Sequence, residues 1–424
     1  MSKTMKKAFS VLLAAAMAAG MTVPAAAEEK ETTLKMIYWH PEQKDIMEEI
    51  NGMFEEENPG VTVELELVPG DEYDKVLKTR LLSDNGPDVY MYFGSLAYQY
   101  AEEGHLADLS EEDFAQNVIP AYTGTCSADG KLYAIPLNAQ AYGVWYNKAV
   151  FEEAGIEELP ATYGEFLDIC ETLKEKGFVP IARGAKDLWT SVHELGPLAN
   201  SFVFNTDEDF QMERYNGDIT FEESPEMNRF FEEYIRLVDN GYIEEGVLGL
   251  NHSQAMQGIA DGETAMVLGL STFYADIKSI NADVEIGYFP LPDEEGNVTM
   301  SGTSDKAIGY WPKSKNVDLA KALVGFYARP EINKLYCEAT QMLPCIKDVV
   351  PKLDEPLVQI SEDLGKAETI FGALDGPWPA PAYETYRKAI QSVHSGERDV
   401  KKMLSDMDAA YDENMDLIGA PGAK

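Results

Sequence analysis

Hydrophobic and polar residues recur along the chain with two periods, and these predict strands and helices in turn. The elements predicted up to residue 93 are strands over 34–39, 61–68 and 88–93 and helices over 42–57 and 72–83. Turn residues separate them at Asn58-Pro59-Gly60 and Gly86-Pro87. The order strand, helix, strand, helix, strand predicts a parallel α/β layer.

The second half of the chain is richer in helical periodicity. Thr162 followed by Glu165 is typical of a capping box at a helix start. The predicted elements are helices over 162–176, 225–239, 383–393 and 400–414 and strands over 131–137, 142–147, 264–268, 284–289 and 305–311. The return of strands between helices predicts a second α/β lobe.

The two lobes have no Pro- or Ser-rich linker between them. We therefore expect strands that cross from one lobe to the other and allow them to hinge. The first crossing is expected within 131–147, the second at 305–311 and a third near Pro351.

The first 27 residues are typical of a secretory signal peptide. Lys3, Lys6 and Lys7 precede a short apolar run over 8–19, and small residues at 25–27 supply a cleavage site. The run is too short for a bilayer span, which needs about 20 residues. No cysteine precedes Cys126, so a lipid anchor is not expected. These features predict an exported protein that is released into a periplasm or the medium.

Composition indicates a folded and strongly acidic protein. Hydrophobic residues make up 45% of the 424 residues, and 74 Asp and Glu face 34 Lys and Arg, for a net charge of −40. Removal of residues 1–27 takes away three lysines and no acids, which leaves −43. Because this charge repels phosphate polyanions, nucleic acid is not an expected partner.

The sequence contains no motif typical of metal binding or catalysis. The five histidines and four cysteines are too scattered for structural zinc, although a bridge from Cys337 to Cys345 is geometrically possible. Asn205, Asp207 and Asp209 resemble the start of a calcium loop, but Phe210 stands where the glycine is needed. The chain has no phosphate-binding glycine loop, nucleophile elbow or zinc-protease helix. We expect neither a cofactor nor a metal, and no enzyme activity.

Aromatic residues stand at the ends of predicted strands, where ligands bind in α/β folds. Trp39 ends the first strand, Phe93 the third, and Trp189 follows a strand that ends near Arg183. Aromatic faces stack on the C–H faces of sugars, whereas Asp, Asn, Gln and Arg bind their hydroxyls. Most of these aromatics could equally be ordinary core residues.

The order of several short segments resembles that of extracellular solute-binding proteins of family 1, the carbohydrate-binding partners of ABC importers. The resemblance covers almost the whole chain after residue 27. The segments that carry it are 54–63 (FEEENPGVTV), 86–89 (GPDV), 104–109 (GHLADL), 129–136 (DGKLYAIP), 145–148 (WYNK), 160–166 (PATYGEF), 262–266 (GETAM), 320–327 (AKALVGFY) and Leu343-Pro344.

The resemblance implies two α/β lobes joined by three crossings around a ligand cleft. It places residues 28–135 and 310–352 in the N-lobe and residues 136–309 and 353–424 in the C-lobe. Carried over position by position, the ligand-binding residues are Trp39, His40, Phe93, Ser95, Asn138, Gln140, Asp187, Trp189, Ser271, Thr272, Asp305, Trp378, Tyr383 and Arg387.

The chain departs from its relatives at two points. Many of them place a tryptophan after the residue that matches Gly269, where this chain has Leu270, so Phe273 or Tyr274 is the candidate replacement. Relatives from single-membrane bacteria usually carry the lipid cysteine that is missing here. Its absence favours a periplasmic location.

We therefore expect a monomeric, non-catalytic binding protein that captures a mono- or oligosaccharide by hinge closure and delivers it to the permease of an ABC transporter. The alternatives are a binding protein for a polyamine or glycerol phosphate, a secreted glycoside hydrolase, and the ligand module of a sensor. The sequence does not name the sugar.

Overall fold

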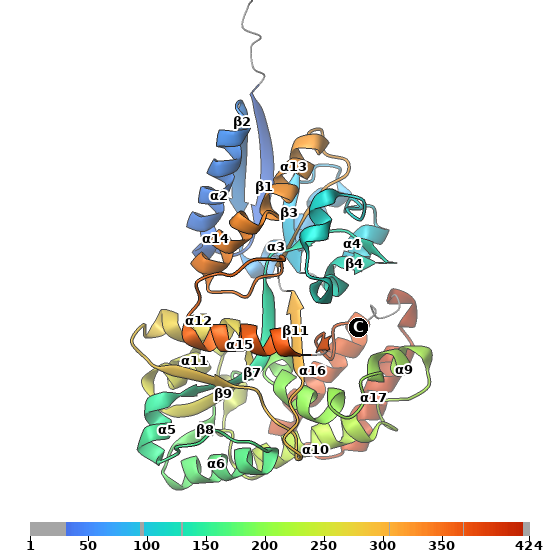
Figure 1. Cartoon of the computed structure of the whole chain (residues 1–424). Helices are drawn as coiled ribbons and strands as arrows, with labels where there is room; N and C mark the ends of the chain where they lie inside the picture. Colours follow the sequence, from blue (N-terminus) through green and yellow to red (C-terminus); the bar gives the residue numbers. More distant parts are fainter. Residues whose placement is uncertain (1–30, 94–96, 129, 305, 368, 419–424) are drawn as a thin grey trace, which may run out of the picture.

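A computed structural model describes residues 31–93, 97–128, 130–304, 306–367 and 369–418. The predicted signal peptide, Ser95 and Asp305 lie outside these residues. Within them the chain forms two α/β lobes, one above the other in Figure 1. The predicted two-lobed α/β fold is confirmed. No helix in the described part of the chain is long and apolar enough to span a membrane.

The N-lobe is built on a five-stranded sheet in the order β2-β1-β3-β12-β6. Strand β1 pairs in parallel with β2 and β3, as the alternating pattern predicts, while β12 runs antiparallel to β3 and β6. The strands are β1 (Thr32–Tyr38), β2 (Val61–Leu67), β3 (Val89–Phe93), β6 (Ile135–Pro136) and β12 (Lys306–Tyr310).

Helices and short segments cover the N-lobe sheet and bury one hydrophobic core. Helix α2 begins two residues later than predicted because Pro41–Gln43 forms a 3-10 turn. The remaining elements are α2 (Lys44–Glu57), α3 (Gly70–Leu82), α4 (Ala97–Glu102), α13 (Val317–Tyr327), α14 (Pro330–Thr340), β4 (Ser127–Ala128), β5 (Lys131–Leu132) and the 3-10 turns at Asp113–Asn117, Pro120–Tyr122 and Gly124–Cys126.

The C-lobe sheet has the order β13-β11-β7-β9-β8, and β10 also pairs with β7. Almost every residue of β7 is buried because helices cover both faces, and separate cores lie on the two sides. The strands are β7 (Ala139–Asn147), β8 (Val179–Ile181), β9 (Thr264–Leu270), β10 (Ile286–Phe289), β11 (Met300–Ser304) and β13 (Ile370–Phe371).

Helices of the C-lobe largely follow the predicted apolar stripes. Thr162 caps α6 by accepting from the Glu165 amide at 3.2 Å, but the Glu165 carboxylate accepts from Ala161, so the capping box is incomplete. The helices are α5 (Lys148–Ala154), α6 (Tyr163–Glu175), α7 (Leu188–His193), α8 (Gly196–Ala199), α9 (Phe210–Asn216), α10 (Pro225–Asp239), α11 (His252–Asp261), α12 (Thr272–Ile280), α15 (Glu355–Lys366), α16 (Ala380–His394) and α17 (Val400–Asp412).

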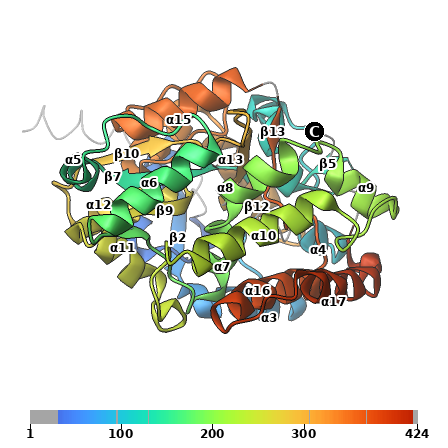
Figure 2. The same ribbon diagram turned by 90° about the horizontal axis from the view of Figure 1, so that it is seen from below.

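Short turns complete the C-lobe, and the last two long helices close it. Figure 2 shows α16 and α17 side by side along one edge, where they pack against α7 and α10. The turns are a π-helical turn at Asn200–Phe204 and 3-10 turns at Val247–Gly249 and Met415–Leu417. Helices α16 and α17 therefore pack with the C-lobe.

The crossings between the lobes lie next to one another (Figure 1). The first runs from β6 into β7, the second from β11 into β12, and the third covers residues 341–354. Ser304 pairs with Ala139, and the Ala139 amide donates to the Leu343 carbonyl at 2.8 Å. Three chain segments thus run within hydrogen-bonding distance at the waist of the molecule.

Two expectations need correction. Strand β12 belongs to the N-lobe sheet, so the second lobe boundary falls near residue 305 and not at 310. The predicted strand over 131–137 is two short strands, β5 and β6, because β5 turns back to pair with β4.

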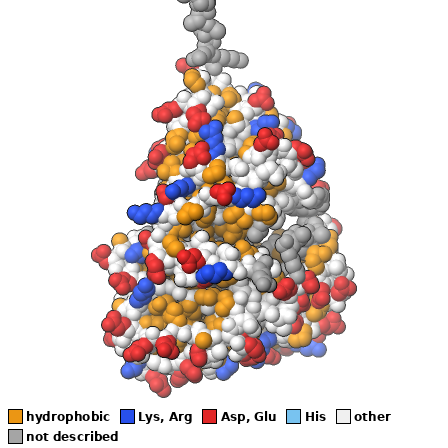
Figure 3. All heavy atoms as spheres, viewed as in Figure 1, with side chains coloured by type: hydrophobic (Ala, Val, Ile, Leu, Met, Phe, Trp, Pro, Cys, Tyr) orange, Lys and Arg blue, Asp and Glu red, His pale blue; other side chains and the backbone are white. Residues whose placement is uncertain are grey.

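The cysteines and the acidic surface also bear on the expectations. All four cysteines are buried and free, so Cys337 and Cys345 are not bridged. On the face shown in Figure 3, Asp and Glu side chains are spread over both lobes with fewer Lys and Arg between them. Within the described residues no group of His, Cys, Asp and Glu is arranged to hold a metal ion, and Asn205 instead bonds the Asn297 carbonyl at 3.2 Å.

The side chain of Asn333 tests the anchoring of the first crossing. It is buried and donates from Nδ2 to the Leu137 carbonyl at 2.7 Å. Because Asn333→Leu would leave that carbonyl with only the weak donor Cys337 Sγ at 3.9 Å, we expect it to lower the free energy of unfolding by about 1–3 kcal/mol. Urea denaturation measures the change. Lys334→Ala, a change of the half-exposed neighbour, should shift the free energy by less than about 0.5 kcal/mol; equal effects of the two variants would contradict the role given to Asn333.

Candidate functional site

The carboxyl ends of the parallel strands in both lobes point toward the crossings. In the C-lobe Leu270, at the end of β9, pairs with Tyr142 near the start of β7. In the N-lobe Phe93, at the end of β3, pairs with Lys306, the first residue of β12. Loops that follow these strands therefore gather at the waist, which is where ligands bind in open α/β sheets.

On the N-lobe side, Trp39 and His40 follow β1. Trp39 is buried, with its ring 4.9 Å from that of Tyr73. His40 is more exposed, and its Nδ1 is hydrogen-bonded to the carboxylate of Glu42. Partial burial works against ionisation of Glu42, but the His40 hydrogen bond and the charge of Lys306 hold its pKa below the ordinary value. Glu42 is thus an anion at the edge of the site.

At the crossings, Asn138 and Gln140 are both buried. Asn138 is 0% exposed, and neither its Oδ1 nor its Nδ2 has a hydrogen-bond partner among the residues that the structure describes. A buried amide without partners costs about 1–3 kcal/mol for each lost bond, which makes Asn138 a candidate to bond a water, a ligand or a residue brought near by lobe movement. Gln140 lies on β7 opposite Thr303.

The C-lobe rim is formed by α7 and the start of α12. Trp189 is 39% exposed, and its ring lies 4.7 Å from His252 and 6.2 Å from Phe273. Asp187 precedes α7, and its carboxylate accepts from the His252 amide at 2.8 Å. Trp189 is the one tryptophan among the five that is not buried.

Ser271 and Thr272 complete this rim beside Phe273. The Ser271 hydroxyl accepts from the Ala141 amide at 3.3 Å, which ties it to β7, while Thr272 is half-buried at the start of α12. The suggestion that Phe273 or Tyr274 offers a platform in place of the missing tryptophan is wrong. Both are buried, and the Phe273 ring instead packs edge-on against the Trp189 ring.

A third group lies around the start of α16. Trp378 is buried and donates from Nε1 to Gln211 at 3.1 Å. The Arg387 guanidinium lies over the Tyr383 ring at 4.9 Å and pairs with Glu384 at 2.7 Å. The structure thus brings together Asp187, Trp189, Ser271 and Thr272 on one rim and Trp378, Tyr383 and Arg387 on another; the side chain of Phe93 is not described.

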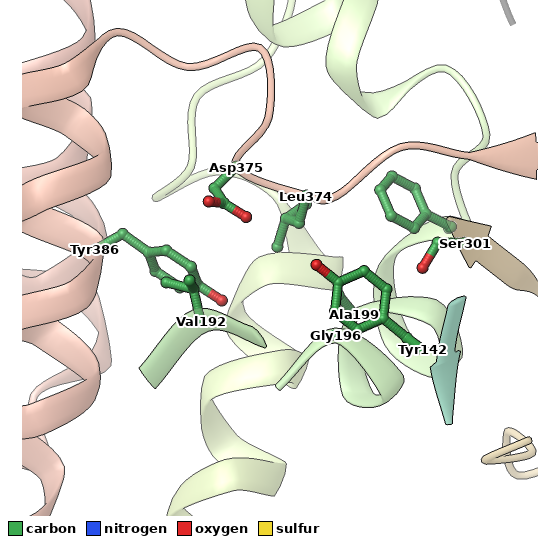
Figure 4. A pocket seen from close by; sticks show the side chains of 9 residues that line it. Tyr142, Val192, Gly196, Ala199, Ser301, Leu374, Asp375 and Tyr386 are labelled. Atoms are coloured by element: carbon green, nitrogen blue, oxygen red, sulfur yellow. The ribbon is translucent and has the colours of Figure 1, made fainter. Parts of the chain in front are cut away.

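Sequence reasoning missed Asp375, which lines a small cavity next to these groups. Figure 4 shows it with Leu374 on a loop, facing Tyr386 from α16 and Tyr142 and Ser301 from the strands. Burial raises the pKa of Asp375 to about 6, although Arg387 and a backbone hydrogen bond oppose the change. Among 74 acidic residues no sequence pattern distinguishes this one.

Two histidines were also missed, because their gathering around Trp189 depends on the fold. His193 lies 6.1 Å from Trp189, ring to ring, and its Nδ1 is 2.9 Å from the Tyr142 hydroxyl. His252 supports the other side and bonds Asp276 at 2.8 Å. The position i+4 of His193 from Trp189 on one helix was the only available signal.

Two lobes, three adjacent crossings and loops that gather between them define a two-lobed binding protein for a small solute. The family model of bacterial extracellular solute-binding proteins matches residues 39–334. The chain belongs to this family, whose members are exported binding proteins.

Relatives of known name extend over most of the chain. The multiple sugar-binding protein of Streptococcus mutans is 25% identical over 361 residues, which cover 83% of this chain and 84% of the relative. The melibiose/raffinose/stachyose-binding protein MelE of Bacillus subtilis is 24% identical, over 71% of this chain and 70% of MelE. The structure of RafE in complex with raffinose has the same fold, with a TM-score of 0.76 and 24% identity over 90% of this chain and 99% of that one.

The raised pKa of Asp375 predicts a pH-dependent stability. A carboxyl whose pKa rises on folding stabilises the fold while it is protonated, and this contribution is lost as the pH rises from about 4 through about 6. Relative to Asp375→Asn, which has no charge to lose, the wild type should lose roughly 2 kcal/mol between pH 4 and pH 7. Urea unfolding of both proteins across this range measures the difference. Glu384→Gln, on the same rim, serves as the control; a constant gap between wild type and Asp375→Asn would contradict the expectation.

Proposed function

We propose that this protein captures an oligosaccharide outside the cytoplasm and delivers it to the permease of an ABC importer, without chemical change to the sugar. The observation that carries the proposal is the exposed Trp189, held at the C-lobe rim among carboxylate, hydroxyl and imidazole groups. An aromatic face with nearby hydrogen-bonding groups suits a ring that has C–H faces and hydroxyls.

Raffinose and stachyose are the first ligands to test. The names of MelE and RafE record binding of such galactosides, and the chain is similar to both over most of its length. Their identities of 24% support a shared fold and class of ligand rather than a particular sugar.

Binding in this proposal shifts an equilibrium between open and closed lobes. Sugar contacts to Trp189 on one lobe and to the His40 region on the other are made together only when the lobes close. The amide of Asn138, which has no partner in the described part of the chain, lies at the crossing that must bend, and in this proposal closure or the ligand supplies its partners. Closure then presents both lobes to the permease.

The protein works as a monomer in this proposal, either free in a periplasm or in the space outside a single membrane. The residues that would contact the sugar on the two rims are Asp187, Trp189, Ser271, Thr272, Tyr383 and Arg387. The N-lobe side and the crossing would add Trp39, His40, Asn138 and Gln140. The family resemblance adds Phe93, Ser95, Asp305 and Trp378 as further expectations.

A thermal-shift screen of residues 28–424 tests the proposal. A ligand that binds the folded state stabilises it by about 2.7 kcal/mol at a hundredfold excess over Kd. We expect raffinose or stachyose to raise the Tm, and Trp189→Ala to weaken binding at least about tenfold. Met212→Ala removes an apolar side chain of similar exposure elsewhere on the C-lobe and should leave binding unchanged.

The screen, together with an assay for reducing ends, separates the alternatives. A Tm rise with spermidine or glycerol phosphate and with none of the sugars would keep the fold and overturn the sugar. Release of reducing ends from an oligosaccharide would overturn the binding protein in favour of a hydrolase.

A further inference from the structure

A buried ion pair lies directly beneath the Trp189 rim. Arg183 follows β8 and Glu194 follows α7, and both side chains are 2% exposed. The distance between Arg183 Nη1 and Glu194 Oε2 is 3.2 Å. Burying two charges costs several kcal/mol of desolvation, and well-packed apolar residues often stabilise a fold as well or better. Stability alone therefore gives a weak reason for the pair.

The pair connects the two ends of the segment that carries Asp187 and Trp189. Glu194 Oε1 accepts from the Gly184 amide at 3.1 Å, so the end of the segment holds its start. Arg183 Nη2 donates to the Ser191 carbonyl at 3.1 Å, so the start holds the last turn of α7. The loop and the helix are thereby closed into one unit.

Further bonds inside this unit fix its geometry. The Thr190 hydroxyl lies 2.7 Å from both the Gly184 and the Asp187 carbonyls. A Cβ on Gly184 would lie 2.8 Å from the His252 backbone nitrogen, so only glycine allows α11 to come this close. That approach places the His252 amide on Asp187 and its ring beside Trp189.

An aromatic ring and a second titratable group lie close to the pair. The Arg183 guanidinium lies over the Tyr234 ring at 5.0 Å. Burial raises the pKa of Glu194, and Arg183 opposes this by favouring the carboxylate. Burial and the charges of Arg183 and Arg398 lower the pKa of His394 to about 3, so this imidazole stays neutral and adds no second positive charge beside Arg183.

We propose that the Arg183–Glu194 pair is a positioning element of the ligand site, which holds Asp187 and Trp189 in their binding geometry before the ligand arrives. Such preorganisation raises affinity, because no part of the binding energy is needed to order the loop when the ligand binds. The ligand half of this proposal rests on the proposed function, whereas the positioning of Trp189 is measurable without any ligand.

The test replaces the pair by apolar residues of similar volume in the variant Arg183→Met/Glu194→Leu. Because both charges are removed together, no unpaired charge stays buried, and the fold should be kept. The matched control is Arg214→Met/Asp408→Leu, since Arg214 is also buried, pairs with Asp408 at 3.1 Å and lies over the Tyr411 ring at 4.0 Å. Glu194→Gln is a second variant that keeps the side-chain shape.

Acrylamide quenching of tryptophan fluorescence reports on Trp189, because the other four tryptophans are 6% exposed or less. Trp189→Phe gives the baseline of those four. If the pair positions the segment, the Trp189 contribution to quenching should rise about twofold in Arg183→Met/Glu194→Leu, as a loosened loop exposes more of the ring. The control variant should stay at the wild-type value.

Titration with raffinose provides the second readout. We expect Kd to rise at least about tenfold in Arg183→Met/Glu194→Leu and to change less than twofold in the control. Unchanged quenching and affinity in a folded variant would overturn the proposal, as would equal losses in both double variants. Should the first double variant not fold, Glu194→Gln decides by the same criteria. If the wild type binds no sugar, the proposed function fails, and quenching alone decides the positioning.

Discussion

Backbone pairing among the crossings at the waist is the constraint on which the rest of the molecule depends. Ala139 pairs with Ser304 of the second crossing, and its amide bonds Leu343 of the third. Because the crossings lie side by side, the lobes can rotate about one narrow region while each keeps its own core. Widely separated crossings would instead brace the lobes against each other.

This arrangement also decides where the ligand groups stand. Strand β7 leaves the waist and becomes the centre of the C-lobe sheet, so the antiparallel strand beside it, β9, ends near the waist, and β8, parallel to β9, runs toward it. The helices that follow β8 and β9, α7 and α12, carry Trp189 and Thr272 near their starts. In the N-lobe, β12 leaves the waist beside β3, and the loop after β1 carries His40. A hinge and a site thus arise from one topology, and the rigid cores fix each half of the site before the halves meet.

Local patterns account for what was predictable from the sequence. The apolar stripe of α10 gave its bounds without error, since Ser224 and Pro225 mark its start. Strand order could not be predicted from such local patterns. Strand β12 joins the N-lobe sheet by pairing with β3, which lies more than 200 residues earlier in the chain. The tryptophans at strand ends look alike in sequence, yet Trp39 and Trp378 pack into cores while Trp189 stays exposed. Packing partners distant in the chain make that difference, as they do for Asp375 and for the two histidines.

The placement of charge favours a neutral ligand over a charged one. On the rims of the site, the cation Arg387 is paired with Glu384, and Lys306 faces the ionised Glu42. A phosphate ester needs positive charge that is not already balanced by the protein, and these cations are balanced. A polyamine needs ionised carboxylates that the protein leaves without partners, but Glu42 is already hydrogen-bonded to His40, and Asp187 already accepts from the His252 amide. A sugar hydroxyl needs no balancing charge. It can form a hydrogen bond with a neutral or ionised carboxyl, with an amide or with another hydroxyl. An exposed indole beside such groups therefore selects rings rather than charges.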